Sequence, residues 1–160
     1  MREIYNLENA VKLSILGMVL VMSCAAAQSK PAGPWRIEVR TEGGIAGKGV
    51  GTYAISSDGA ISVVSMSGMK CSYRATPEEL ERIGLLLGAA HPETWKASYA
   101  PEDRCCDRIQ YTMTVEQDGD TRTTEWIDDP LPMPKDLRDL SAAMMGPAPS
   151  IRDSYSARCR

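Results

Sequence analysis

The segment RTEGGIAGKGVGTY, residues 40–53, decides the fold, because its five glycines and one lysine belong either to a phosphate-binding loop or to a turn between strands. A phosphate-binding loop leads into a helix and keeps its glycines and lysine at fixed spacings. Here Glu42 stands where the first glycine is required, and Gly49 follows Lys48 in place of Ser or Thr. The segment therefore does not fit that nucleotide-binding motif.

The dinucleotide-binding pattern fits the same segment only in part. Residues 49–54 have the spacing G-x-G-x-x-A, but the chain then runs through TYAIS (52–56) to Asp58 and Gly59. That continuation indicates a strand and a turn, whereas the dinucleotide motif requires a helix. We therefore interpret residues 43–49 as a glycine-rich turn and expect no nucleotide and no cofactor.

Outside this turn, periodicities of two and of about 3.6 residues predict strands and helices. Period-two alternation marks five stretches, with turns at Asp58-Gly59 and Asp118-Gly119: Trp35–Val39, Thr52–Ser56, Ile61–Ser67, Ile109–Val115 and Arg122–Ile127. Together with two helical segments they give the order βββαββα. This order predicts an α+β fold, with a mostly antiparallel sheet of about five strands and two helices packed on one face.

The first predicted helix has a complete start signal. Thr76 can cap it, Pro77 fits its first position and Glu79 completes a capping box, while Pro92 ends the segment. The second helix is expected to begin near Pro134. The predicted buried faces are Leu80, Ile83, Leu87 and Ala90 in the first helix and Leu137, Leu140 and Met144 in the second.

Residues 1–27 have the features of a secretory signal peptide. A polar start precedes the apolar run LSILGMVLVM and a group of small residues. Ten apolar residues are too few to span a bilayer, which needs about 20. Two cleavage sites stay open: an ordinary cut after Ala27, or a lipoprotein cut before Cys24, where Leu20–Cys24 resembles a bacterial lipobox. The first predicts a periplasmic or secreted protein, and the second predicts an envelope lipoprotein attached to the membrane through lipid on Cys24.

The rest of the chain is expected to form one domain. Residues 28–34 suit a flexible tether, residues 35–145 the α+β domain and residues 146–160 a C-terminal tail. The first 27 residues carry equal numbers of basic and acidic side chains, so the remaining chain keeps the net charge of −3. Because basic residues do not cluster, we expect no nucleic-acid partner.

Four cysteines remain after either cleavage: Cys71, Cys105, Cys106 and Cys159. An even number in an oxidising compartment predicts two disulfide bonds. A bond between the neighbours Cys105 and Cys106 would form a strained ring, so Cys71 and Cys159 are each expected to pair with one of them. A four-thiolate zinc site is less favoured, because adjacent cysteines depart from the usual ligand spacing. We therefore predict disulfides and no metal.

The sequence offers no catalytic motif. The single histidine, His91, lies at a predicted helix end, where it is favourable as a cation beside the helix dipole. The patterns GxSxG and HExxH are absent. The acidic pairs Glu78-Glu79 and Asp128-Asp129 suit a helix start and a strand end. We therefore predict a non-enzymatic protein without catalytic residues.

Three short motifs between Arg36 and Met144 resemble those of one protein family. They are IEVRTEGGIAGKG (37–49), the D-x-I-x-Y-x-M-x-V rhythm of Asp107–Val115 and the P-x-x-L-x-x-L spacing of Pro134–Leu140. In this combination the chain resembles the emfourin-like family, whose members are small bacterial inhibitors of thermolysin-like metalloproteases. Four cysteines and an export signal are additions to the simplest members of that family.

The resemblance implies a protein-binding turn. Gly43 and Gly44 match the turn of the family, Ile45 stands where an aromatic residue such as Phe is usual, and Lys48 is a solvated charge on the same turn. The implied function is protease inhibition, with a metalloprotease as the favoured partner. The alternative function is that of an envelope lipoprotein with a role in assembly or in binding a small ligand.

Overall fold

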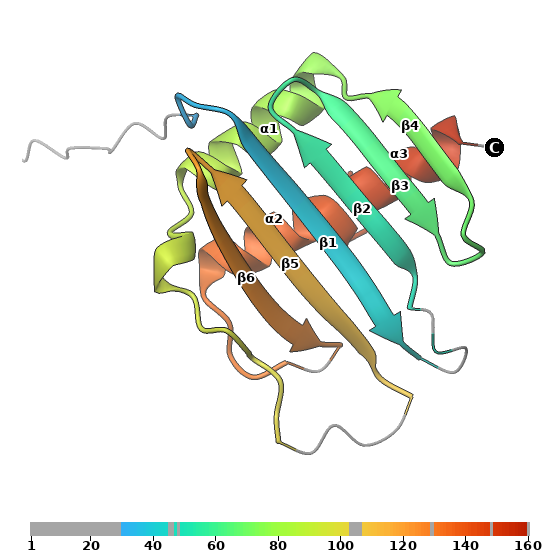
Figure 1. Cartoon of the computed structure of the whole chain (residues 1–160), viewed down its shortest axis with the longest axis vertical. Helices are drawn as coiled ribbons and strands as arrows, with labels where there is room; N and C mark the ends of the chain where they lie inside the picture. Colours follow the sequence, from blue (N-terminus) through green and yellow to red (C-terminus); the bar gives the residue numbers. More distant parts are fainter. Residues whose placement is uncertain are drawn as a thin grey trace, which may run out of the picture.

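A computed structural model of the chain describes residues 30–44, 47, 49–102, 107–128, 130–147 and 149–159. Within these ranges, six strands form one antiparallel sheet in the order β4-β3-β2-β1-β5-β6. The strands are β1 (Trp35–Gly43), β2 (Gly51–Ser56), β3 (Ala60–Ser65), β4 (Lys70–Arg74), β5 (Ile109–Gln117) and β6 (Asp120–Ile127). Three α-helices, α1 (Pro77–Gly88), α2 (Lys135–Met145) and α3 (Ile151–Arg158), cover one face of the sheet (Figure 1), and the short 3-10 helix η1 is Pro92–Thr94.

The predicted α+β class with an antiparallel sheet is confirmed, but the expected five strands and two helices are too few. Strand β4 was missed because it has only five residues, three of them polar and exposed, so its alternation is weak. Helix α3 was missed because Ile151 is its one buried residue among the described side chains. This helix lies in residues 146–160, which the sequence indicated as a tail. The order along the chain is therefore ββββαββαα.

The hydrophobic core lies between the sheet and the helices. Alternate strand residues point into it, as the period-two pattern predicted, and β1 and β5 present most of their polar residues to the opposite face. The largest fully buried side chains are Ile37, Val39, Ile55, Ile61, Val63, Ile83, Leu87, Met113, Leu137, Leu140, Met144 and Ile151. The predicted faces of both helices are thus largely correct, with Leu80 only partly buried.

The start of α1 is the capping box that the sequence predicted. The Thr76 hydroxyl accepts a hydrogen bond from the Glu79 backbone N–H at 3.1 Å, and the Glu79 carboxylate accepts one from the Thr76 N–H at 2.7 Å. Pro77 occupies the first turn, where its missing N–H costs nothing. Reciprocal capping satisfies two backbone donors and fixes where the chain enters the helix.

Candidate functional site

The turn between β1 and β2 is tied to its surroundings at its base. The Gly44 N–H donates to the Arg108 carbonyl at 3.0 Å, and the Gly49 N–H donates to the Gly43 carbonyl at 2.8 Å. Gly43 and Gly44 have φ values of 81° and 69°, as expected of a glycine turn. The backbone just before β5 and the end of β1 therefore fix the start of this turn.

Thr41 fixes the other side of the same turn. Its side chain is buried, and its hydroxyl accepts hydrogen bonds from the N–H groups of Val50 at 2.7 Å and Gly51 at 2.9 Å. The same hydroxyl donates to the Gly51 carbonyl at 2.7 Å. Sequence reasoning did not single out Thr41. The available signal was a polar residue at the next inward position after Trp35, Ile37 and Val39, where a buried hydroxyl requires partners.

Part of this turn lies outside the described residues. Of the predicted protein-binding residues, Gly43 and Gly44 are placed, whereas Ile45 and Lys48 fall outside the described ranges, as do Cys24, Cys105, Cys106 and Asp129. Gly43 and Gly44 lie at the end of β1, which is an interior strand between β2 and β5. The predicted binding turn thus joins two interior strands of the sheet, β1 and β2.

A second turn lies at the same end of the sheet (Figure 1). Gly51, the first residue of β2, pairs with Ser65, the last residue of β3, so the β1–β2 turn and the β3–β4 turn are neighbours. The β3–β4 turn carries Met66 and Met69, whose exposed fractions are 52% and 60%. This end of the sheet therefore combines a glycine turn with exposed thioether side chains.

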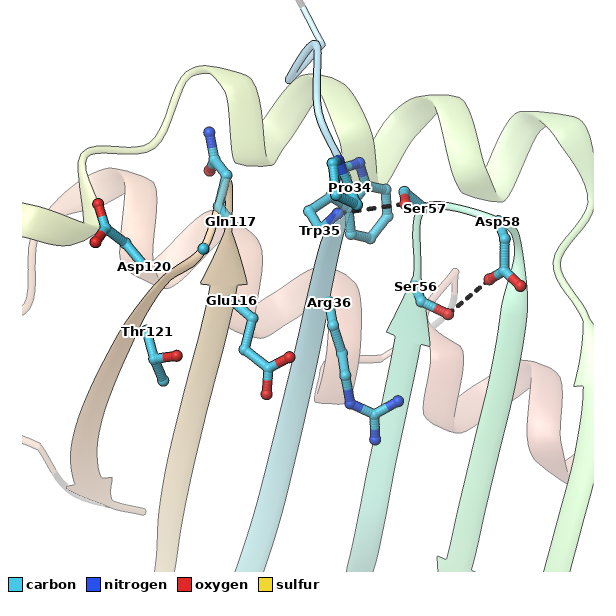
Figure 2. Close-up of a pocket in the computed structure, with 11 residues that line it drawn as sticks. Pro34, Trp35, Arg36, Ser56, Ser57, Asp58, Glu116, Gln117, Asp120 and Thr121 are labelled. Carbon is cyan, nitrogen blue, oxygen red and sulfur yellow. Dashed lines mark hydrogen bonds between the residues drawn. The ribbon is translucent and has the colours of Figure 1, made fainter.

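The opposite end of the sheet carries an open hollow of about 380 Å³ on the face away from the helices. Figure 2 shows Glu116, Arg36 and Ser56 beside one another on the neighbouring strands β5, β1 and β2. The Asp58 carboxylate accepts hydrogen bonds from the Ala60 N–H at 3.0 Å and the Ser56 hydroxyl at 2.7 Å. These two bonds, the Ala60 bond first, lower the pKa of Asp58 below its usual value.

The lining of this hollow combines the apolar Pro34 and Trp35 with carboxylates, hydroxyls and the Arg36 guanidinium. Arg36 is engaged with Glu38 at 2.8 Å, and the Ser57 hydroxyl accepts a hydrogen bond from the Trp35 N–H at 3.2 Å. Its described lining contains neither histidine nor cysteine, so the serine hydroxyls have no adjacent imidazole base. Carboxylates and hydroxyls are thus the groups that this hollow offers for hydrogen bonding.

The candidate catalytic groups lie on separate elements, at the two ends of α1 and just after β6. His91 is exposed beyond the end of α1, with its Nδ1 atom 3.3 Å from Glu93. Its backbone N–H and the Trp95 indole N–H both donate to the Asp136 carboxylate, at 2.9 and 3.0 Å. Among the residues that the structure describes, no three His, Cys, Asp or Glu side chains gather as a metal-binding group. His91 thus belongs to a network that joins η1 to α2.

The expected disulfide pairing is wrong. Cys71 in β4 is bonded to Cys159, which directly follows α3, and not to Cys105 or Cys106. The error arose because the pairing was inferred from the strain of a bond between neighbours, whereas α3 brings Cys159 to β4. Cys105 and Cys106 lie outside the described residues, so the described part of the chain contains this one disulfide.

Scans of this chain against protein-family models, curated proteins and solved structures give no match. No helix within the described ranges is both long enough and apolar enough to cross a membrane. The fold and its bond between Cys71 and Cys159 define the chain as a disulfide-bonded α+β domain with one antiparallel sheet.

Proposed function

We propose that this chain is an exported, non-enzymatic binding protein that inhibits a protease, with a metalloprotease as its favoured target. The observation that carries the proposal is the anchored base of the β1–β2 turn. The Thr41 hydroxyl accepts hydrogen bonds from the N–H groups of Val50 and Gly51 and donates one to the Gly51 carbonyl. The Arg108 carbonyl accepts a hydrogen bond from the Gly44 N–H. A turn whose base is fixed before binding loses less conformational entropy when it enters the cleft of a partner.

The position of the turn in the sheet adds to this support. Strands β1 and β2 each have a hydrogen-bonded strand on both sides, so neither is an edge strand that can fray. In the proposed complex, Ile45 enters the cleft of the protease, Gly43 and Gly44 shape the turn, and Lys48 stays in solvent. The similarity of residues 37–49 to the emfourin-like family favours a metalloprotease over other targets.

The test is a titration of protease activity with the mature chain. We expect stoichiometric loss of thermolysin-like metalloprotease activity and no loss of serine protease activity. Ile45→Asp should weaken inhibition by at least about tenfold, because a charge would enter a desolvated contact. Ala60→Asp is the matched control, since Ala60 is exposed at the opposite end of the sheet, and it should inhibit like the parent chain. An inactive parent chain, or equal losses in both variants, would contradict the proposal.

The alternative function, that of an envelope lipoprotein with an assembly or small-ligand role, has one observation in its favour. The hollow in Figure 2 offers Glu116, Asp120 and Thr121 beside Arg36, in a volume of about 380 Å³. A thermal-shift screen of small polar ligands tests this function. A shift that is lost in Glu116→Gln and kept in Ile45→Asp would favour the alternative over inhibition.

A further inference from the structure

The six methionines that the structure describes fall into two groups. Within the described ranges, Met113, Met133, Met144 and Met145 are buried in the core. Met66 and Met69 are 52% and 60% exposed, and they lie three residues apart in the sequence MSGM at the tip of the β3–β4 hairpin. Core packing therefore does not explain the two methionines at the tip, in contrast to the other four.

The backbone that carries these two side chains is well fixed. The Gly68 N–H donates to the Ser65 carbonyl at 2.8 Å, and the Ser65 N–H donates to the Met69 carbonyl at 2.9 Å. The Ser65 hydroxyl also accepts the Met69 N–H at 3.1 Å and lies 2.8 Å from the Ser67 hydroxyl. Both methionine side chains thus start from a fixed turn, and the rotatable bonds of each side chain let its sulfur atom adjust its position.

The chemistry of the tip favours a soft cation. Thioether sulfur is a soft, uncharged ligand that selects Cu(I), whereas carboxylates and carbonyls suit Mg²⁺, Ca²⁺ and Mn²⁺. The stretch Ser65–Lys70 contains no Asp, Glu or His, so its side chains offer nothing that these harder ions prefer. Cys71, the nearest cysteine in the sequence, is held in its disulfide with Cys159 and supplies no thiolate. We propose that Met66 and Met69 form a binding site for a soft monovalent metal ion, Cu(I) or its analogue Ag(I).

An apolar docking surface is the competing explanation, because Val64 is also 37% exposed beside the same turn. Leucine separates the two explanations, since it has nearly the size and apolarity of methionine but no sulfur. A docking surface keeps its function in Met66→Leu and Met69→Leu, whereas a metal site loses the sulfur atoms that bind the ion.

The experiment is an Ag(I) titration of the mature protein with ¹³C-labelled methionine methyl groups, after alkylation of any free thiol. We expect the methyl resonances of Met66 and Met69 to move together and saturate, while those of Met113 and Met144 stay in place. In competition with a Cu(I) chelator under reducing, oxygen-free conditions, the double variant Met66→Leu/Met69→Leu should lose at least about tenfold in affinity. Met133→Leu is the control for a methionine within the core and should bind like the parent chain.

Three results would overturn the proposal. One is an unchanged affinity of the double leucine variant, provided that its melting temperature matches that of the parent. The second is the absence of any methyl shift from Met66 and Met69 with Ag(I). The third is a shift of the same two methyl groups by Zn²⁺ at similar concentrations, because this would remove the selectivity for soft ions on which the proposal depends.

Discussion

Cys71 is joined by a disulfide bond to Cys159, and the two cysteines are 88 residues apart in the sequence. The bond links the edge strand β4 to the end of the last helix, α3. Beside it, the Arg158 guanidinium lies 5.1 Å from the centre of the Tyr73 ring and 3.3 Å from the Glu79 carboxylate. The C-terminal helix is therefore held to both β4 and the start of α1.

Removal of this bond should destabilise the domain. Because it closes a long loop, we expect the double variant Cys71→Ser/Cys159→Ser to lose about 2 to 4 kcal/mol in the free energy of unfolding. Urea denaturation measures the loss, and the parent chain in reductant should approach the variant. Peptide mapping without reductant that links Cys71 to Cys105 or Cys106 would contradict the pairing.

Glu79 should make stability depend on pH in acid. Burial raises the pKa of its carboxyl group, but hydrogen bonds from Ser154 and Thr76 and the charge of Arg158 outweigh this, so its pKa lies below the usual 4.5. A lowered pKa contributes stability above pH 4.5 that is lost as the pH falls through the value in the folded protein. We expect Glu79→Gln to lower the free energy of unfolding by about 1 to 2 kcal/mol at pH 7.

The same comparison at low pH is the check on Glu79. The difference in free energy of unfolding between the parent and Glu79→Gln should shrink from pH 7 to pH 3, because the parent carboxylate becomes protonated. A difference that stays constant over this range would show that the charge of Glu79 contributes nothing.

Tyr73 should make stability depend on pH in alkali. Burial and the negative charge of Glu79 raise the pKa of Tyr73 to about 12, although the positive charge of Arg158 lowers it. A raised pKa contributes stability that is complete below pH 10 and is lost as the pH rises towards 12. Tyr73→Phe should therefore flatten the decline in stability between pH 10 and 12. Equal slopes for the parent and the variant would contradict this.

Two glycines of the β1–β2 turn should differ in their tolerance of a side chain. Gly43 and Gly47 have φ values of 81° and 67°. Substitution of either glycine by alanine should therefore lower the free energy of unfolding by about 1 kcal/mol. A Cβ atom on Gly43 would also lie 2.4 Å from the Arg108 carbonyl oxygen, whereas one on Gly47 would meet none of the described residues within 4 Å. Gly43→Ala should therefore cost about 1 to 3 kcal/mol more than Gly47→Ala. Thermal denaturation of the two variants makes the comparison, and equal costs would argue against this turn geometry.

The proposed lipid anchor has a direct test in a bacterial host. Labelled palmitate should appear on the chain, and Cys24→Ala should abolish the label while leaving the domain folded. Both results follow if Cys24 becomes the first residue of a lipoprotein. A mature protein that starts at Gln28 and carries no label would instead indicate a periplasmic or secreted form.

Local patterns were sufficient to predict most elements of this fold. The capping box at Thr76 and Glu79 involves residues three apart, and its hydrogen bonds form wherever the helix forms. The alternation of Trp35, Ile37 and Val39 similarly predicts which face of β1 is buried, because successive side chains of a strand point to opposite faces. At the candidate site, the glycine spacing predicted a turn, and the positive φ values of Gly43 and Gly44 agree with it.

The features that the sequence did not predict all depend on contacts between distant residues. Thr41 is a turn anchor only because β1 and β2 pair and bring Val50 and Gly51 to its hydroxyl. Helix α3 is largely polar, yet Cys159 and Arg158 join it to β4 and α1, which lie far away in the chain. The sequence by itself therefore determined the class of fold and the glycine turn, because both follow from local periodicity and backbone preference. Only the tertiary structure decided strand β4, helix α3 and the disulfide partner of Cys71, because their stability comes from packing across the sheet.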